Sequence, residues 1–138
     1  MSMDFLKSLG IAASGLRAQS GRMRVIAENL ANADSTGSKP GADPYRRKIP
    51  TFSQRMDREF GEKVVSLGRV ARDNTAFKTR FEPGNPAADG SGQVKLPNVD
   101  GLVETMDMRE AQRSYEANLN VVTSTRRMIA RTLDILRA

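Results

Sequence analysis

Four carboxylates in the second half of the chain are the first residues whose type and spacing could do chemistry. They are Glu104, Asp107, Glu110 and Glu116. Paired carboxylates can act as general acid and general base. These four fall on a predicted helix, where ion pairs at the helix surface are the simpler explanation. We expect Glu110 to pair with Arg113 or Ser114, and Glu116 to meet arginines of other chains.

The chain contains no His and no Cys. Their absence removes imidazole bases, thiol nucleophiles, disulfides and most transition-metal sites. The sequence also has no evident phosphate-binding loop. We therefore expect a protein that is not an enzyme, with no catalytic residue, no cofactor and no metal site.

The only tight basic run, Arg46-Arg47-Lys48, could contact phosphates of a nucleic acid. Aromatic residues that could stack on bases are limited there to Tyr45. The formal net charge of +6 is spread along the chain and does not form a basic stripe. A charged strand start on the surface explains the run better, and we expect no nucleic-acid partner. A basic nucleic-acid-binding coiled-coil protein is the alternative function.

Two long segments without proline must position these residues. In the N-terminal segment, small or apolar residues recur in steps of three and four at Leu6, Leu9, Ala13, Leu16, Ser20, Met23, Ala27 and Leu30. The C-terminal segment repeats the pattern at Tyr115, Leu119, Val122, Arg126, Ile129, Leu133 and Leu136. Such heptad stripes predict helices over residues 3–31 and from 99 or 101 to 136, each needing a packing partner. Asp100 or Asn98 can cap the second helix.

All six prolines lie between these segments. We expect a loop over residues 37–50, two or three short strands over 62–81, and a short edge strand or extended segment over 93–96. Residues 51–60 are ambiguous, because Phe52, Met56 and Phe60 step by four and allow a short helix. The predicted fold is mainly α with a small β-containing middle, and the terminal helices form a coiled-coil core. The predicted domains are 1–36, 37–98 and 99–138.

The predicted middle has few large apolar residues, so its core should be of marginal stability. We expect either an oligomer or a monomer that is partly unfolded. No apolar run is long enough to span a bilayer, so we expect no direct membrane insertion. The N-terminus also lacks the pattern of a cleaved secretory signal peptide.

Two polar motifs interrupt the predicted stripes. Asn29 and Asn32 lie near the end of the first helix, where they can bind freed carbonyls or a neighbouring helix. Tyr115 and Asn118 lie within one turn of an otherwise apolar stripe, and a polar residue there fixes register. The stretches Asn29-Leu30-Ala31-Asn32 and Tyr115-Glu116-Ala117-Asn118 resemble the terminal motifs of the bacterial flagellar axial proteins, the family of rod, hook and hook-associated subunits.

Further stretches in the middle narrow this resemblance to the flagellar basal-body proteins of the proximal rod. They are Pro44-Tyr45-Arg46-Arg47-Lys48, Phe81 to Asp89, and Leu96-Pro97-Asn98-Val99. The chain departs from the family pattern at Asp100-Gly101, so its second helix should start a residue or two later. It also departs at Thr79-Arg80, which affects the expected strand pairing of the middle.

The resemblance implies a structural subunit of the flagellar basal body, part of the periplasmic rod that transmits torque to the hook. The implied partners are copies of the chain, other proximal and distal rod proteins, the rod-base hook-basal-body protein and the flagellar type III export apparatus. Export would use no cleaved signal peptide. The implied subunit-interface residues are Leu6, Leu9, Leu16, Met23, Asn29, Asn32, Tyr45, Arg46, Arg47, Tyr115, Asn118, Leu119, Val122, Ile129, Leu133 and Leu136.

Overall fold

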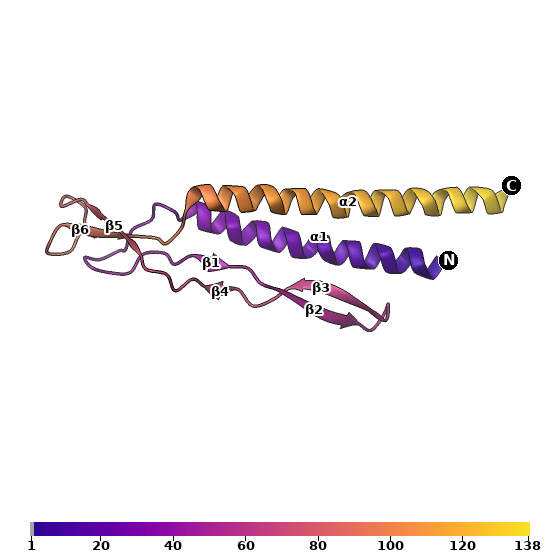
Figure 1. Ribbon diagram of the computed structural model, residues 1–138, viewed down its shortest axis with the longest axis horizontal. Coiled ribbons are helices and arrows are strands. Elements are labelled where there is room, and N and C mark those ends of the chain that lie inside the picture. Colours follow the sequence, from indigo (N-terminus) through magenta and orange to yellow (C-terminus); the bar gives the residue numbers. More distant parts are fainter. Residues whose placement is uncertain (1) are drawn as a thin grey trace. The chain divides into compact units, whose positions relative to one another are not determined.

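A computed structural model describes residues 2–138 and has a long helix at each end of the chain (Figure 1). Helix α1 covers Ser2–Ala31 and helix α2 covers Gly101–Arg137. Six short strands lie between them in the sequence: β1 (Lys48–Ile49), β2 (Phe52–Asp57), β3 (Glu62–Leu67), β4 (Ala71–Arg72), β5 (Lys78–Phe81) and β6 (Gln93–Leu96). This confirms the prediction of two long terminal helices with short strands between them.

The strands form three separate antiparallel pairs, β1 with β4, β2 with β3, and β5 with β6. The possible helix over residues 51–60 is wrong, because Phe52–Asp57 is strand β2. A spacing of four residues repeats on one face of a helix and equally on one face of a strand. The partner strand β3 decides between them, together with Gly61, whose positive φ of 66° suits the hairpin turn.

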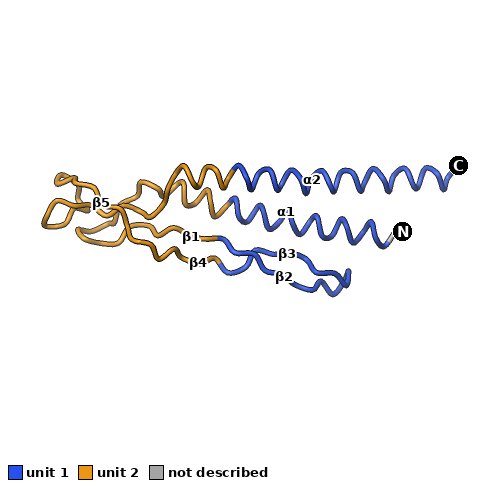
Figure 2. The backbone as a smooth tube through the Cα atoms, in the orientation of Figure 1, with its two compact units in different colours: residues 1–23, 50–69, 109–138 blue, residues 24–49, 70–108 orange. Residues whose placement is uncertain are grey.

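The chain divides into two compact units, drawn in blue and orange in Figure 2. Unit 1 contains the chain up to Met23, Pro50–Arg69 and Arg109–Ala138. Unit 2 contains Arg24–Ile49 and Val70–Met108. Each unit therefore takes part of both helices and part of the segment that joins them.

In unit 1, the glycines of α1 lie where other elements approach it closely. An added Cβ at Gly15 would meet the side chain of Asn118 on α2 at 2.7–2.9 Å. At Gly21 it would meet Leu67 of β3 at 2.9 Å. Glycine costs about 1 kcal/mol of helix propensity relative to alanine. The close packing of α1 explains why the chain carries glycine there.

In unit 2, apolar side chains from α1, from β6, from the loop between β5 and β6, and from the segment just before α2 are buried. They are Val25, Ile26, Ala87, Val94 and Val99. Asp100 caps α2, since its Oδ1 accepts hydrogen bonds from the backbone N–H groups of Leu102 and Val103. Neither described helix is long and apolar enough to cross a membrane.

The alternative prediction, that Asn98 caps α2, is wrong. Its Oδ1 accepts a hydrogen bond from the Arg47 N–H at 2.8 Å, and its Nδ2 donates to the Asp73 carbonyl at 3.0 Å. Asn98 therefore joins two loop segments of unit 2 and does not cap the helix.

Candidate assembly interface

Asn29 is a fully buried polar side chain of unit 2 that makes four hydrogen bonds. Its Nδ2 donates to the Lys48 carbonyl at 2.8 Å and to Glu104 Oε2 at 3.2 Å. Its Oδ1 accepts from the Tyr45 hydroxyl at 2.8 Å and from the Lys48 N–H at 3.0 Å. One side chain thus joins α1, β1 and the first turn of α2. Asn29, the first residue of the predicted asparagine motif, therefore fixes the positions of these three elements within the chain.

Glu104 is the second buried member of this cluster, with 1% of its surface exposed. Its carboxylate pairs with the Arg47 guanidinium, which also contacts Asp73 at 3.4 Å and Asp107 at 3.7 Å. The expectation that Glu104 belongs to a helix-surface ion pair is therefore wrong. Its partner is distant in the sequence, and both charges are shielded from water. A buried carboxylate needs such a partner to avoid a large desolvation cost.

The electrostatics of the cluster raise the pKa values of Arg47 and Tyr45. Burial would lower the pKa of Arg47, but hydrogen bonds and charge from Glu104 and then Asp73 raise it. Burial first, and then the negative charges of Glu28 and Glu104, raises the pKa of Tyr45 to about 12. Both shifts favour the protonated forms, which are the forms that donate hydrogen bonds in the cluster.

The predicted basic run, Arg46 to Lys48, is bonded within the chain. The Arg46 guanidinium lies over the Phe77 ring, 4.3 Å from its centroid, and donates to the Asp73 carbonyl at 2.9 Å. Lys48 pairs with Glu28 at 2.5 Å. Since Arg47 is held by acidic residues as well, the run is not a free basic patch for nucleic acid.

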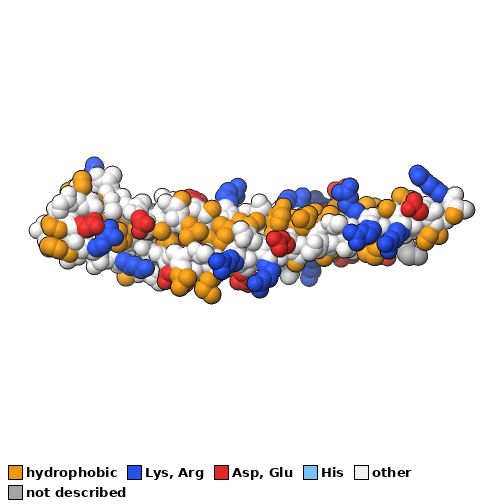
Figure 3. Space-filling model, turned by 90° about the horizontal axis from the view of Figure 1, so that it is seen from above, with side chains coloured by type: hydrophobic (Ala, Val, Ile, Leu, Met, Phe, Trp, Pro, Cys, Tyr) orange, Lys and Arg blue, Asp and Glu red, His pale blue; other side chains and the backbone are white. Residues whose placement is uncertain are grey.

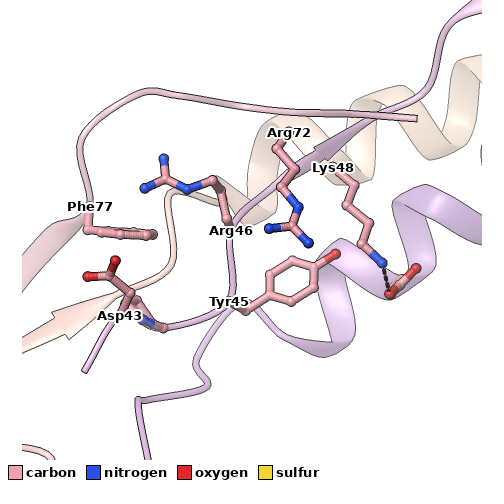
Figure 4. Close-up of a pocket in the computed structure, with 8 residues that line it drawn as sticks. Asp43, Tyr45, Arg46, Lys48, Arg72 and Phe77 are labelled. Atoms are coloured by element: carbon pink, nitrogen blue, oxygen red, sulfur yellow. Dashed lines mark hydrogen bonds and ion pairs between the residues drawn. The ribbon is translucent and has the colours of Figure 1, made fainter. Parts of the chain in front are cut away.

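A surface hollow of about 430 Å³ lies beside this run. Figure 4 shows Tyr45, Arg46 and Lys48 around it, with Arg72 from β4. Asp43 and Glu28 also line the hollow, so its charges are mixed. Among the described residues, no group of three or more acidic, Cys or His side chains is placed to hold a metal ion.

The predicted stripe of α1 is not the face that packs inside the chain. The buried side chains of α1 include Ala12, Ser14, Ala18, Val25, Ile26 and Asn29. Leu6 is 52% exposed, and Leu9, Leu16 and Met23 are half-buried. The stripe therefore lies next to the packed face and keeps accessible apolar surface.

The predicted stripe of α2 is also accessible. Leu119, Leu133 and Leu136 are exposed, while Tyr115, Val122 and Ile129 are half-buried. Helix α2 also exposes six large apolar side chains that the predicted stripe did not include, namely Leu102, Val103, Met106, Val121, Met128 and Ile135. Steps of seven from Val121 through Met128 to Ile135, and of four from Leu102 to Met106, carried a signal for a second stripe. Exposed apolar surface of this extent is typical of a binding face.

The remaining predicted polar residues have local roles. Asn32 Nδ2 donates to the Glu28 carbonyl at 2.8 Å, so it closes the end of α1 as the sequence suggested. Asn118 Nδ2 donates to the Ser114 carbonyl at 2.9 Å and packs on Gly15. Glu110 does not pair with Arg113 or Ser114. It meets Arg22 of α1 at 3.6 Å, because that side of α2 lies against α1 in unit 1.

The ends of the chain match two flagellar family profiles. Residues 9–39 match the profile described as flagella basal body rod protein, and residues 91–135 match that of the flagellar basal body rod FlgEFG protein C-terminal region. These ranges contain most of α1 and most of α2.

Relatives align over nearly the whole chain. The flagellar basal-body rod protein FlgC of Agrobacterium fabrum is 52% identical over 93% of this chain and 92% of its own length. FlgC of Salmonella typhimurium is 41% identical over 96% of this chain and 98% of its own. FlgC of Bacillus subtilis is 34% identical over 96% and 99%. The chain therefore belongs to the flagellar basal-body rod protein FlgC family.

Proposed function

We propose that this chain is a structural subunit of the flagellar basal body, where it forms part of the proximal rod that transmits torque to the hook. It does this by packing and not by catalysis. Its terminal segments, 1–36 and 99–138, build a coiled-coil core with neighbouring subunits, and segment 37–98 lies outside that core. Its partners are copies of itself, other rod proteins and the rod-base hook-basal-body protein.

The observation that carries this proposal is the unburied apolar surface of α2. Leu133, Ile135 and Leu136 near its end are 51%, 75% and 77% exposed. Burying apolar surface contributes about 25 cal/mol per Å², and an exposed helical stripe gains this only from a partner. Family membership supports the rod as the place where that partner is found.

The middle of the chain supports a second kind of contact. We propose that Tyr45, Arg46 and Arg47 hold the hollow of unit 2 in shape, so that an acidic side chain of a neighbour can enter beside Arg72. Arg72 is exposed and, within residues 2–138, forms no ion pair. We further propose that the flagellar type III export apparatus delivers the chain to the periplasmic rod.

The proposal that the two predicted stripes pack against neighbouring subunits can be tested by introducing a charge. Leu16→Asp or Leu133→Asp would bury a carboxylate against a neighbouring helix, which costs several kcal/mol. We expect cells carrying either variant to make and export the protein but not to swim. Gln54→Asp, a change at an exposed position of β2, is the control and should preserve swimming. If cells with Leu133→Asp swim, this position is not packed against a neighbouring helix in the assembled rod.

A further inference from the structure

The outer side of α2 repeats one set of charged residues after eighteen positions. The first set is Arg109, Arg113 and Glu116, and the second is Arg127, Arg131 and Asp134. Eighteen residues make five helical turns, so both sets lie on the same side of α2, about 27 Å apart along its axis. Each set offers two cations one turn apart, followed by one carboxylate.

These six side chains are not used for ion pairing within the described part of the chain. All six are exposed, and none forms an ion pair with any residue between 2 and 138. Ala111 and Thr125, which are buried, lie on the opposite side of the helix. The contrast with Arg22, Arg47 and Lys48 is clear, since those three are paired with carboxylates.

Apolar side chains accompany the two charged sets. Val121, Met128 and Ile135 follow α2 beside them and are 46%, 47% and 75% exposed. Figure 3 shows basic and hydrophobic side chains mixed along this surface. An apolar stripe flanked by charges is the pattern by which helices choose a partner and a register.

We infer that this side of α2 binds α2 of a second copy of the chain, parallel to it and displaced along the axis by about five residues, or about 7.5 Å. At that displacement Glu116 of one copy lies level with the gap between Arg109 and Arg113 of the next. Because the pattern repeats, Asp134 then lies level with the gap between Arg127 and Arg131. Both carboxylates meet an arginine pair in the same register. The inference rests on the proposed function and specifies one contact of that assembly.

The parallel arrangement follows from the need to continue. In the displaced pair, one copy uses its carboxylates and the other uses its arginine pairs. The arginine pairs of the first copy and the carboxylates of the second stay at the edge of this contact, where further copies can meet them in an open-ended, heterologous series. An antiparallel pair could also bring Glu116 near Arg127 and Arg131. It would use both sets of both copies at once and would stop at a dimer.

Charge reversal tests the contact in cells that lack the native chain. One variant carries Glu116→Arg and Asp134→Arg, and the other carries Arg109→Glu, Arg113→Glu, Arg127→Glu and Arg131→Glu. Each alone places like charges opposite each other, which is strongly unfavourable, and should reduce the swimming fraction roughly tenfold or more. When both variants are expressed in one cell, copies that alternate in the assembly again place opposite charges against each other. Swimming should then be restored. A matched control reverses Arg55, Arg58, Lys63 and Arg69, which are exposed in unit 1, and should swim.

Cross-linking tests the direction, and the absence of native Cys leaves no background. With Arg109→Cys and Glu116→Cys in one chain, a short thiol cross-linker should give a ladder of dimers, trimers and larger species in isolated basal bodies. With Arg127→Cys and Glu116→Cys, it should give far less product. Dimers from the second pair alone, or swimming by both charge variants separately, would overturn the inference. If the parent chain rescues swimming in these cells, the rod assignment stands in either case. If cells lacking the chain swim, the proposed function itself fails.

Discussion

Replacing Asn29 by alanine should destabilise the protein far more than replacing the other asparagine of the same motif. The Asn29 side chain makes four hydrogen bonds and has no exposed surface. Alanine would leave the Lys48 N–H and carbonyl, the Tyr45 hydroxyl and one oxygen of Glu104 without this partner. Asn32 makes one side-chain hydrogen bond as donor, to the Glu28 carbonyl, and is half-buried.

The size of the effect follows from how many groups lose a partner. A buried polar group left without a hydrogen bond costs about 1–3 kcal/mol. Tyr45 and Lys48 are half-buried, so water can replace part of what they lose, and Glu104 keeps Arg47. We therefore expect Asn29→Ala to lower the free energy of unfolding by about 3–5 kcal/mol, against about 1 kcal/mol for Asn32→Ala. A typical domain is stable by about 5–15 kcal/mol, so the first change should be severe.

Urea unfolding of the full chain measures this difference. The parent, Asn29→Ala and Asn32→Ala are compared at one protein concentration by circular dichroism, so that self-association affects all three alike. The order expected is parent, then Asn32→Ala, then Asn29→Ala by a wide margin. If the two variants lose similar stability, Asn29 does not join the elements of unit 2 as described.

Other changes probe unit 1 and the alkaline range. Gly15→Ala should fail to give the usual gain in helix stability of about 1 kcal/mol, because the new Cβ would meet the Asn118 side chain at 2.7 Å. Adding Asn118→Ala should recover that gain in thermal unfolding. A double variant without this recovery would contradict the contact between Gly15 and Asn118. Unfolded tyrosine ionises near pH 10.0, whereas Tyr45 keeps its proton to about pH 12, so the unfolded state binds fewer protons in between and stability should fall as pH rises through this range. Tyr45→Phe should reduce that fall and Tyr115→Phe should not, and equal slopes for both variants would refute the assignment.

The sequence predicted the helices well because their signals are local. A pattern of steps of three and four, the absence of proline and a capping Asp100 all act within a few residues. The predicted range 3–31 differs from α1 by one residue at its start, and α2 begins at one of the two positions expected. The middle was harder, since Phe52 and Met56 fit a helix and a strand equally well until β3 is known to pair with them.

The candidate site shows where sequence reasoning stops. The two asparagine motifs were identified, but the partners of Asn29 lie as far away as Glu104, and no local pattern connects them. The predicted stripe of α1 depends mainly on its leucines, whereas the packed face of α1 uses small residues such as Ala12 and Ala18. Small side chains permit close approach but carry little hydrophobic signal. Arg47 looked like part of a surface run because its acidic partners come from other segments.

A density map of the isolated flagellar basal body, in which this chain is traced, would show whether it belongs to the proximal rod. We predict that the chain lines the proximal rod, with α1 and α2 in its inner, helical layer and the exposed side of α2 covered by neighbouring subunits. A proximal rod built entirely from other chains would refute this prediction. So would a map in which this chain is present but its α2 faces solvent along its whole length.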